Sequence, residues 1–243
     1  LAAGRGSRLK SLTQDKPKCL NILNKYTLLD WQLATLKKKV DDIFLVKGYL
    51  SELFINKQIN YIYNSDWERT NMIESLYIFL NQTECSDVII TYGDIIYNEE
   101  ILSKLIDSQQ DIVIPYDKNW YELWKRRFKD PLEDAESFIV DKKNWLISLG
   151  KKKPDYNEIQ GQYMGIIKIS KKGFKIVLEN LHKMNVDQRR QIDITTFLNN
   201  LLEKQKIFTI PIFGNWMEFD IPSDFEVAKK LISENKLKLT KVD

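Results

Sequence analysis

The sequence predicts an α/β fold in which a mostly parallel, mixed sheet is flanked by helices. Short runs of β-branched and aromatic residues alternate with helical patterns, and this alternation is typical of parallel strands whose connecting helices cover both faces of a sheet. The 243 residues include 43% apolar and 29% charged residues, with few glycines and prolines. Such a composition belongs to a globular chain that is long enough to bury a sizeable core.

The first half supplies most of the expected parallel strands. Strand-like runs lie at 41–49, 59–64, 86–94 and 111–117. Helical patterns lie between them at 28–39 and 71–82, the second with Ile73, Leu76, Tyr77 and Leu80 on one face. Ligands of open α/β sheets bind beyond the carboxyl ends of the strands, so the loops after these strands are the places to seek chemistry.

The second half mixes strands and helices in a less regular order. Strands are expected at 135–141, 144–150, 162–170 and 207–213, and helices at 171–184, 192–205 and 222–235. Ser223 and Glu226 have the spacing of a capping box at the start of the last helix. Because no repeat or low-complexity linker divides the chain, we expect a single domain over residues 1–243. Within it, residues 1–117 would form a nucleotide-binding half and residues 118–243 an acceptor-binding half.

Charge and cysteine usage exclude several classes of protein. Lysine and arginine number 37 against 34 aspartates and glutamates, a surplus of 3 that is too small to indicate a nucleic-acid or membrane-surface protein. Two cysteines, Cys19 and Cys85, cannot build a disulfide framework or a zinc site, which favours the cytoplasm. No apolar run approaches the roughly 20 residues of a spanning helix, and no secretion signal is visible. The only histidine, His182, is expected at a helix end without a functional role.

The opening stretch, "LAAGRGSRLKSLTQDKPKCL", has the composition of a phosphate-binding loop. It is not a Walker loop, and the dinucleotide fingerprint fails because Leu9 stands where the third glycine belongs. Small residues around Gly4 and Gly6 let a phosphate approach the backbone N–H groups, while Arg8 and Lys18 bring two cations to a polyphosphate. A glycine turn with solvated cations is the alternative. The chain opens on leucine rather than methionine, so we expect preceding residues that form the strand leading into this loop.

Four motifs in order resemble those of the nucleotidyltransferase family, which activates sugar phosphates and small phosphorylated alcohols as nucleoside-diphosphate derivatives. They are "LAAGRGSRL", "KPKCL", "YGD" at 92–94 and "WMEFD" at 216–220. The resemblance implies a Rossmann-like nucleotidyltransferase fold with Mg²⁺ held by Asp94 and Asp220, and with Arg8 and Lys18 on the phosphates. It also implies that the nucleotide is bound by Leu1, Ala2, Ala3, Gly4, Gly6, Tyr92 and Gly93. Taken singly, Asp94 and Asp220 could instead be turn or capping carboxylates, although two aspartates with phosphate oxygens suit Mg²⁺.

Three further stretches resemble the CTP-dependent branch that acts on phosphocholine, 2-aminoethylphosphonate or L-glutamine phosphate. They are "SDWERTNMIESLYIF", "PLEDAESFIVD" and "EIQGQYMGIIKIS". The resemblance implies CTP as co-substrate and a small phosphorylated acceptor. The glycine-rich base-reading segment of the sugar-specific branches is not visible. Asn71 and Ser75, four residues apart on one helix face, are candidates to read the pyrimidine and ribose, or else are ordinary polar surface.

The candidate acceptor residues combine aromatic rings with both signs of charge. Aromatic faces and carboxylates suit a quaternary ammonium, whereas the basic run 125–129 suits carboxylate or phosphate, so the mixture favours a zwitterionic acceptor. A solvated basic helix face is the alternative for that run. The acceptor-binding candidates are Trp124, Arg126, Asp134, Glu136, Gln160, Gln162, Tyr163 and Trp216. Lys151 matches a family lysine that contacts the acceptor phosphate, but it could equally be exposed to solvent.

A phosphate acceptor with a second pKa near ~6 is already anionic at neutral pH and can attack the α-phosphorus of CTP without a strong general base. Arg8, Lys18 and Lys151 are therefore assigned to position the two anions and neutralise their charge. The favoured acceptor is L-glutamine phosphate, giving CDP-L-glutamine for capsular phosphoramidate groups, followed by 2-aminoethylphosphonate and phosphocholine. A sugar-1-phosphate nucleotidyltransferase and a catalytically silent binding module remain alternatives, and the oligomeric state stays open.

Overall fold

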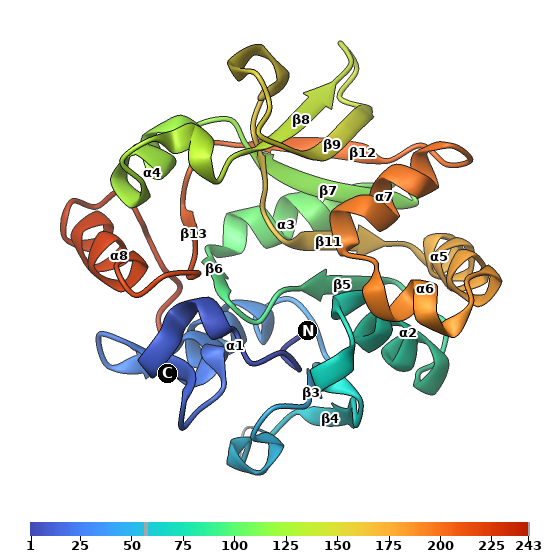
Figure 1. Cartoon of the computed structure of the whole chain (residues 1–243), viewed down its shortest axis with the longest axis horizontal. Coiled ribbons are helices and arrows are strands. Elements are labelled where there is room, and N and C mark those ends of the chain that lie inside the picture. Colours follow the sequence, from blue (N-terminus) through green and yellow to red (C-terminus); the bar gives the residue numbers. More distant parts are fainter. Residues whose placement is uncertain (56–57, 243) are drawn as a thin grey trace.

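The computed structural model describes residues 1–55 and 58–242 and has a mixed sheet between two groups of helices (Figure 1). At its centre β11 (Ile166–Ile169) pairs antiparallel with both β5 (Val88–Thr91) and β7 (Ile112–Asp117), so β5 and β7 run in the same direction. Along β7 lie β12 (Phe208–Ile212), which is parallel to it, and the short β10 (Gln162–Tyr163), which is antiparallel.

The first residues of the chain extend this sheet toward β3 (Phe44–Lys47) and β4 (Asn60–Tyr63), which are parallel to each other. The Leu1 nitrogen donates to the Thr91 carbonyl at 2.6 Å, and the Gly93 nitrogen donates to the Leu1 carbonyl at 2.8 Å. On the other side, the Ala2 nitrogen donates to the Val46 carbonyl at 2.9 Å. The expected mostly parallel mixed sheet is therefore confirmed, with β11 as its reversed central strand.

Two hydrophobic clusters cover the two faces of the sheet. Successive side chains of a strand point to opposite faces, and accordingly Val113 of β7 belongs to one cluster while Ile112 and Ile114 belong to the other. The first cluster takes residues from α1 (Leu28–Leu36), α3 (Glu99–Asp107), α4 (Trp120–Arg127) and α8 (Asp224–Ser233). The second takes residues from α2 (Met72–Gln82), α5 (Lys171–Lys183) and α7 (Ile194–Leu202), while α6 (Val186–Gln191) packs against α2.

Within the described residues, three short antiparallel pairs lie outside the central sheet. They are β1 (Ile22–Leu23) with β2 (Tyr26–Thr27), β6 (Ile95–Tyr97) with β13 (Trp216–Glu218), and β8 (Glu136–Val140) with β9 (Leu146–Lys152). No helix within residues 1–55 and 58–242 is long and apolar enough to cross a membrane.

Two local expectations need correction. Ser223 stands at the N-cap of α8, but its backbone is already helical and its side chain makes no capping hydrogen bond, so the expected capping box with Glu226 is absent. The strand expected over 162–170 is interrupted between β10 and β11, where Gly165 has a φ of 72°. A Cβ at Gly165 would lie 2.7 Å from Cδ2 of Tyr92, so this break also brings the backbone close to that ring.

Candidate active site

The glycine loop leaves the sheet after Ala3 and presents unpaired backbone donors. Within the described part of the chain, the N–H groups of Gly4, Arg5 and Gly6 donate no hydrogen bond. A Cβ at Gly4 would meet no atom within 4 Å. Such a row of free N–H groups is suited to phosphate oxygens.

Gly6 explains why the loop requires a glycine. Its φ is 69°, and a Cβ there would lie 2.7 Å from Cδ of Lys18. The missing side chain therefore provides both the left-handed backbone and the space through which the Lys18 stem passes. Immediately afterwards a 3₁₀ helix, Ser7–Thr13, carries Arg8.

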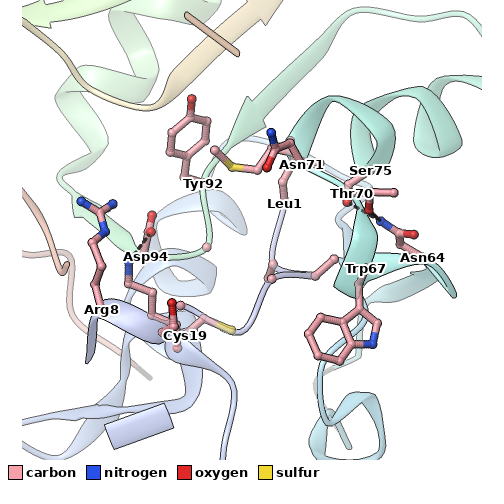
Figure 2. Close-up of a pocket in the computed structure, with 18 residues that line it drawn as sticks. Leu1, Arg8, Cys19, Asn64, Trp67, Thr70, Asn71, Ser75, Tyr92 and Asp94 are labelled. Carbon is pink, nitrogen blue, oxygen red and sulfur yellow. Dashed lines mark hydrogen bonds and ion pairs between the residues drawn. The ribbon is translucent and has the colours of Figure 1, made fainter. Parts of the chain in front are cut away.

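The loop forms one wall of a cavity of about 360 Å³. In Figure 2, Arg8 and Asp94 lie on one side of this cavity, while Trp67, Thr70 and Ser75 lie on the opposite side. The lining residues are Leu1, Ala2, Ala3, Gly4, Gly6, Ser7, Arg8, Lys18, Cys19, Asn64, Trp67, Thr70, Asn71, Met72, Ser75, Tyr92, Gly93 and Asp94. All the residues that the sequence assigned to the nucleotide thus line a single cavity.

The pairing of β6 with β13 brings the two predicted metal ligands together. Glu218 pairs with Ile95, and the next hydrogen bond runs from the Phe219 nitrogen to the Asp94 carbonyl at 3.0 Å. Asp94 precedes β6 and Asp220 follows β13, so their carboxylates meet at the same end of the pair. This proximity depends on the register of two strands that are more than 100 residues apart.

Lys18 joins the two carboxylates. Its Nζ donates to Oδ2 of Asp94 at 2.8 Å and to Oδ1 of Asp220 at 2.7 Å. The side chains of Lys18 and Asp220 are each only 11% exposed. Arg8 adds a second cation, with Nη2 at 2.9 Å from Oδ1 of Asp220 and Nη1 at 4.0 Å from Oδ1 of Asp134.

The charges of this cluster stabilise one another. Burial lowers the pKa of Lys18, but the carboxylates of Asp94 and Asp220 outweigh it and the pKa is raised above 10.5. Burial raises the pKa of Asp220, but Lys18, Arg8 and Arg127 outweigh it and the pKa is lowered below 3.8. Lys18 and Asp220 are therefore both ionised throughout the neutral range.

Asp94 and Asp220 are the candidate ligands for a divalent cation. No group of three or more His, Cys, Asp or Glu side chains that could hold a metal ion occurs among residues 1–55 and 58–242. Asp94 and Asp220 nevertheless both reach the Lys18 ammonium, so their oxygens already converge on one cation. Mg²⁺ is commonly held by one or two carboxylates together with substrate phosphates, and this pair fits that pattern.

The opposite wall contains a hydrogen-bonded polar cluster of Asn64, Thr70 and Ser75, of which the sequence indicated only Ser75. Nδ2 of Asn64 donates to the hydroxyls of Thr70 and Ser75, both at 3.0 Å. Oδ1 of Asn64 accepts from the Asp66 nitrogen at 3.1 Å, which fixes the orientation of the amide. Asn64 directly follows β4, so its position after a strand was the signal that could have revealed it.

Asn71 and Trp67 complete this wall. Nδ2 of Asn71 donates to the Gln191 carbonyl at 2.5 Å, which ties the start of α2 to the end of α6. The indole of Trp67 packs edge-on against Tyr49 with ring centroids 5.1 Å apart. No local pattern in the sequence singled out Trp67.

The predicted acceptor residues lie outside the cavity lining, but two of them contact it. Asp134 approaches Arg8, and the ring of Tyr163 packs edge-on against Tyr92 with centroids 6.0 Å apart. Burial raises the pKa of Tyr163, so its phenol stays neutral. These two contacts place part of the predicted acceptor set beside the cavity of about 360 Å³.

The remaining acceptor candidates are engaged with other parts of the protein. Gln162 exchanges hydrogen bonds with the backbone of Glu136, and Gln160 accepts from the Val140 nitrogen at 2.9 Å. The Glu136 carboxylate pairs with Lys152. Lys151 contacts both carboxylate oxygens of Glu158, at 2.8 and 2.9 Å.

On α4 and β13 the aromatic candidates are part of the core. Trp124 and Trp216 are each 2% exposed, and Nε1 of Trp216 donates to Oδ2 of Asp117 at 2.9 Å. Arg126 pairs with Glu234 at 3.0 Å. None of these three side chains reaches the described cavity. His182, which was expected to have no role, lies at the end of α5 and contacts Asn81.

Comparisons with known proteins identify the family and the fold of this chain. The family model described as a MobA-like NTP transferase domain matches residues 1–148. The CTP:phosphoglutamine cytidylyltransferase of Campylobacter jejuni is 35% identical over 245 residues, covering 93% of this chain and 96% of that protein. The bifunctional protein GlmU of Methanococcus aeolicus is 24% identical over 246 residues, covering 97% of this chain but 54% of that protein. This chain therefore spans about half the length of that relative.

Among solved structures, the CTP:phosphocholine cytidylyltransferase of Streptococcus pneumoniae matches with a TM-score of 0.71. The alignment covers 95% of this chain and 96% of that chain at 17% identity, so it establishes a common fold. The expected nucleotidyltransferase fold is confirmed by this match. With a family model over more than half of its residues and a 35% identical relative over nearly its whole length, the chain belongs to the MobA-like NTP transferase family and is an enzyme of the nucleotidyltransferase class.

Proposed function

We propose that this enzyme transfers CMP from CTP to a small phosphorylated, zwitterionic acceptor and releases pyrophosphate. The favoured acceptor is L-glutamine phosphate, which gives CDP-L-glutamine, a precursor for capsular phosphoramidate groups. The observation that carries the proposal is the contact of Lys18 with Asp94 and Asp220 beside a loop with free backbone donors. The Campylobacter jejuni relative, whose name specifies CTP and phosphoglutamine, supports the choice of substrates.

The two walls of the cavity suit the two ends of CTP. The loop N–H groups and Arg8 would bind the outer phosphates, and the polar cluster would face the base. Because the Ser75 hydroxyl accepts from Asn64, its own hydrogen is available for a further acceptor, such as N3 of cytosine, which is a donor in uracil. Asn71 uses its Nδ2 on Gln191, which leaves its carbonyl oxygen to accept from the cytosine amino group.

Nucleotidyltransferases of this kind generally use a divalent metal ion together with the nucleotide. We propose Mg²⁺ as that ion and Asp94 and Asp220 as the residues that hold it. The ion would supply positive charge to the CTP phosphates.

In the proposed reaction an oxygen of the acceptor phosphate forms a bond to the α-phosphorus while the bond from that phosphorus to the pyrophosphate oxygen breaks. The acceptor needs no strong base, because its phosphate is largely dianionic above a pKa of about 6. Lys18 would neutralise charge at the reacting phosphorus, and Arg8 would hold the departing pyrophosphate. Lys151 is proposed to contact the acceptor phosphate, which requires it to exchange its contact with Glu158.

The acceptor side of the proposal rests on resemblance and on the charges near the cavity. Asp134 and Tyr163 are the candidates that lie against cavity residues, and Asp134 would face the ammonium of the acceptor. The division into a nucleotide half and an acceptor half of one domain stays a prediction. We also propose the cytoplasm as the site of the reaction, since two cysteines give no disulfide framework for an oxidising compartment.

A substrate panel tests the proposed function. The protein is incubated with CTP, UTP, ATP, GTP or dTTP and with L-glutamine phosphate, 2-aminoethylphosphonate, phosphocholine or sugar 1-phosphates, while pyrophosphate release is followed. We expect pyrophosphate with CTP and L-glutamine phosphate at the highest kcat/KM. Preferential turnover of a sugar 1-phosphate would replace the proposal with the sugar-specific alternative.

The metal assignment is tested with Asp94→Asn. This variant should lose CDP-product formation while its circular dichroism and melting temperature stay close to those of the parent. Asp111→Asn is the matched control, because Asp111 pairs with Lys172 outside the cavity. Near-full turnover of Asp94→Asn would contradict the assignment.

A further inference from the structure

We propose that Arg127 is a positioning residue that fixes the orientation of Asp220 in the active site. The inference rests on the proposed function, because it assigns Arg127 a role through a residue that we place on the metal. Arg127 belongs to the basic run 125–129 and ends α4. Its side chain is 0% exposed, so it is not part of a solvated helix face.

Arg127 holds both ends of the turn that carries Asp220. Its Nε and Nη2 donate to the two carboxylate oxygens of Asp224, at 2.9 and 3.2 Å, and its Nη1 donates to Oε1 of Glu218. Glu218 is the last residue of β13 and Asp224 is the first residue of α8. One guanidinium therefore spans the segment between a strand and a helix, with Asp220 in the middle.

Asp224 transmits this restraint to the backbone of the turn. Its Oδ2 accepts from the nitrogens of Asp220 and Ile221, at 2.7 and 3.0 Å. The oxygen that Arg127 Nη2 contacts is thus the same oxygen that holds the Asp220 backbone. Because the Asp224 side chain is fully buried, no water can replace either interaction.

The Asp220 carboxylate is also oriented directly. Lys18 and Arg8 both bind its Oδ1, whereas Nη2 of Arg127 lies 3.9 Å from its Oδ2. One oxygen consequently faces the cations of the glycine loop and the other faces the buried guanidinium. When Lys18 and Arg8 turn to the phosphates of a bound nucleotide, Arg127 remains as the cation behind Asp220.

Aromatic rings fix the plane of the guanidinium. The Arg127 Cζ lies 4.9 Å from the ring centroids of both Trp124 and Phe128. A lysine could reach only part of this arrangement, because it lacks the planar fork that binds two carboxylates at once. A buried ion cluster of this kind does not by itself indicate a large contribution to stability, since apolar residues of similar volume often stabilise a protein equally well or better. Its geometry instead accounts for why an arginine stands behind a functional carboxylate.

The neighbouring residue provides a matched control. Arg126 lies on the same helix and also pairs with a carboxylate, that of Glu234, at 3.0 Å. The two arginines therefore differ in whether their partners support Asp220. A general loss of α4 structure would affect variants of both.

The test measures metal binding separately from turnover. Arg127→Lys, Glu218→Gln and Arg126→Lys are purified, and Mn²⁺ binding is titrated by electron paramagnetic resonance with a non-reactive CTP analogue present. Affinity for the analogue is measured without metal, and melting temperatures are recorded. Partners of metal ligands typically change metal affinity by about 10–100-fold. We expect a Mn²⁺ affinity at least about 10-fold lower in Arg127→Lys and a smaller loss in Glu218→Gln.

Analogue affinity without metal should stay within about twofold of the parent, since Arg127 does not line the cavity. Arg126→Lys should match the parent in Mn²⁺ affinity and in analogue affinity, both of which are measured without acceptor. Glu218→Gln keeps a hydrogen-bond acceptor for Arg127 and serves as the test if Arg127→Lys does not fold. Unchanged Mn²⁺ affinity in the folded variants, or an equal loss in Arg126→Lys, would overturn the inference. A protein that binds the analogue and Mn²⁺ but converts no acceptor would contradict the proposed function and leave this inference intact.

Discussion

Replacement of Lys18 by methionine should separate the structural and catalytic contributions of the ammonium. The methionine keeps most of the apolar stem that passes Gly6 but leaves the carboxylates of Asp94 and Asp220 without their shared donor. Arg8 still contacts Asp220 at 2.9 Å, and Asp94 is 26% exposed and can be hydrated. The loss of stability should therefore stay below the full cost of an unpaired buried charge.

The expected magnitudes follow from these contacts. Hydrogen bonds to charged groups contribute about 1.5–3 kcal/mol each, and with the partial compensation we expect a net destabilisation of about 2–3 kcal/mol. For a chain of this size that corresponds to a decrease in melting temperature of about 5–10 °C. Removing one preorganised donor from a reacting group typically lowers kcat by about 10²–10³-fold, and we expect the same for Lys18→Met.

The pH dependence of this stability term has a definite sign. The pKa of Lys18 is raised above 10.5 in the folded protein, so its contribution is fully present below 10.5 and is lost only as the pH rises through the raised value. The difference in melting temperature between Lys18→Met and the parent should therefore be constant between pH 7 and pH 9.

Differential scanning fluorimetry and the pyrophosphate assay check these values. Lys172→Met is the control, because Lys172 is 74% exposed and pairs with Asp111 on the surface. Turnover of Lys18→Met within threefold of the parent would refute the catalytic role, and an unchanged melting temperature would refute the stabilising role.

Three further predictions concern the cavity and the acceptor. Ser75→Ala should raise KM for CTP about 3–10-fold and reduce the preference for CTP over UTP, because a hydrogen bond worth about 0.5–1.5 kcal/mol is lost; Ser103→Ala, whose hydroxyl bonds to the Glu99 carbonyl within α3, should leave both unchanged. Gly6→Ala and Gly214→Ala should both lose about 1–2 kcal/mol of stability from a left-handed backbone, but only Gly6→Ala should lose turnover, because a Cβ at Gly214 meets no atom within 4 Å. Below a pH of about 6, kcat/KM for a phosphate acceptor should fall because the acceptor dianion is protonated, while Asp220, whose pKa is lowered, stays ionised. If the fall at acidic pH occurs at the same pH for acceptors with different second pKa values, the acceptor is not the group that titrates.

Most of the fold could be predicted because the strands and helices have strong local periodicity. The helix expected at 71–82 is α2. The strands expected at 41–49, 59–64, 86–94 and 111–117 are β3, β4, β5 and β7, and each strand is shorter than its expected range. The capping box at Ser223 is absent because its backbone is already helical, and its side chain makes no capping hydrogen bond.

The lining of the cavity could be predicted where one contiguous motif supplies it, as in the glycine loop, whereas the roles of those residues stay a prediction. The meeting of Asp94 with Asp220 depends on strand register, which no local pattern encodes. The burial of Arg127 could not be predicted either, because a run of basic residues is typical of a solvated helix face. Asn64 could have been predicted, because it is a polar residue directly after a strand, but it was not singled out from the sequence.

The Lys18 contact also bears on how the two carboxylates are arranged before a cation binds to them. Two neighbouring carboxylates repel each other. Without a cation between them, this repulsion would have to be overcome when a nucleotide binds. The Lys18 ammonium keeps the two carboxylates close together, with its Nζ 2.8 Å from Oδ2 of Asp94 and 2.7 Å from Oδ1 of Asp220. In the proposed reaction, entry of CTP with its cation would exchange one positive charge for another, so the carboxylates would hardly need to move and the Lys18 ammonium would be released next to the phosphates.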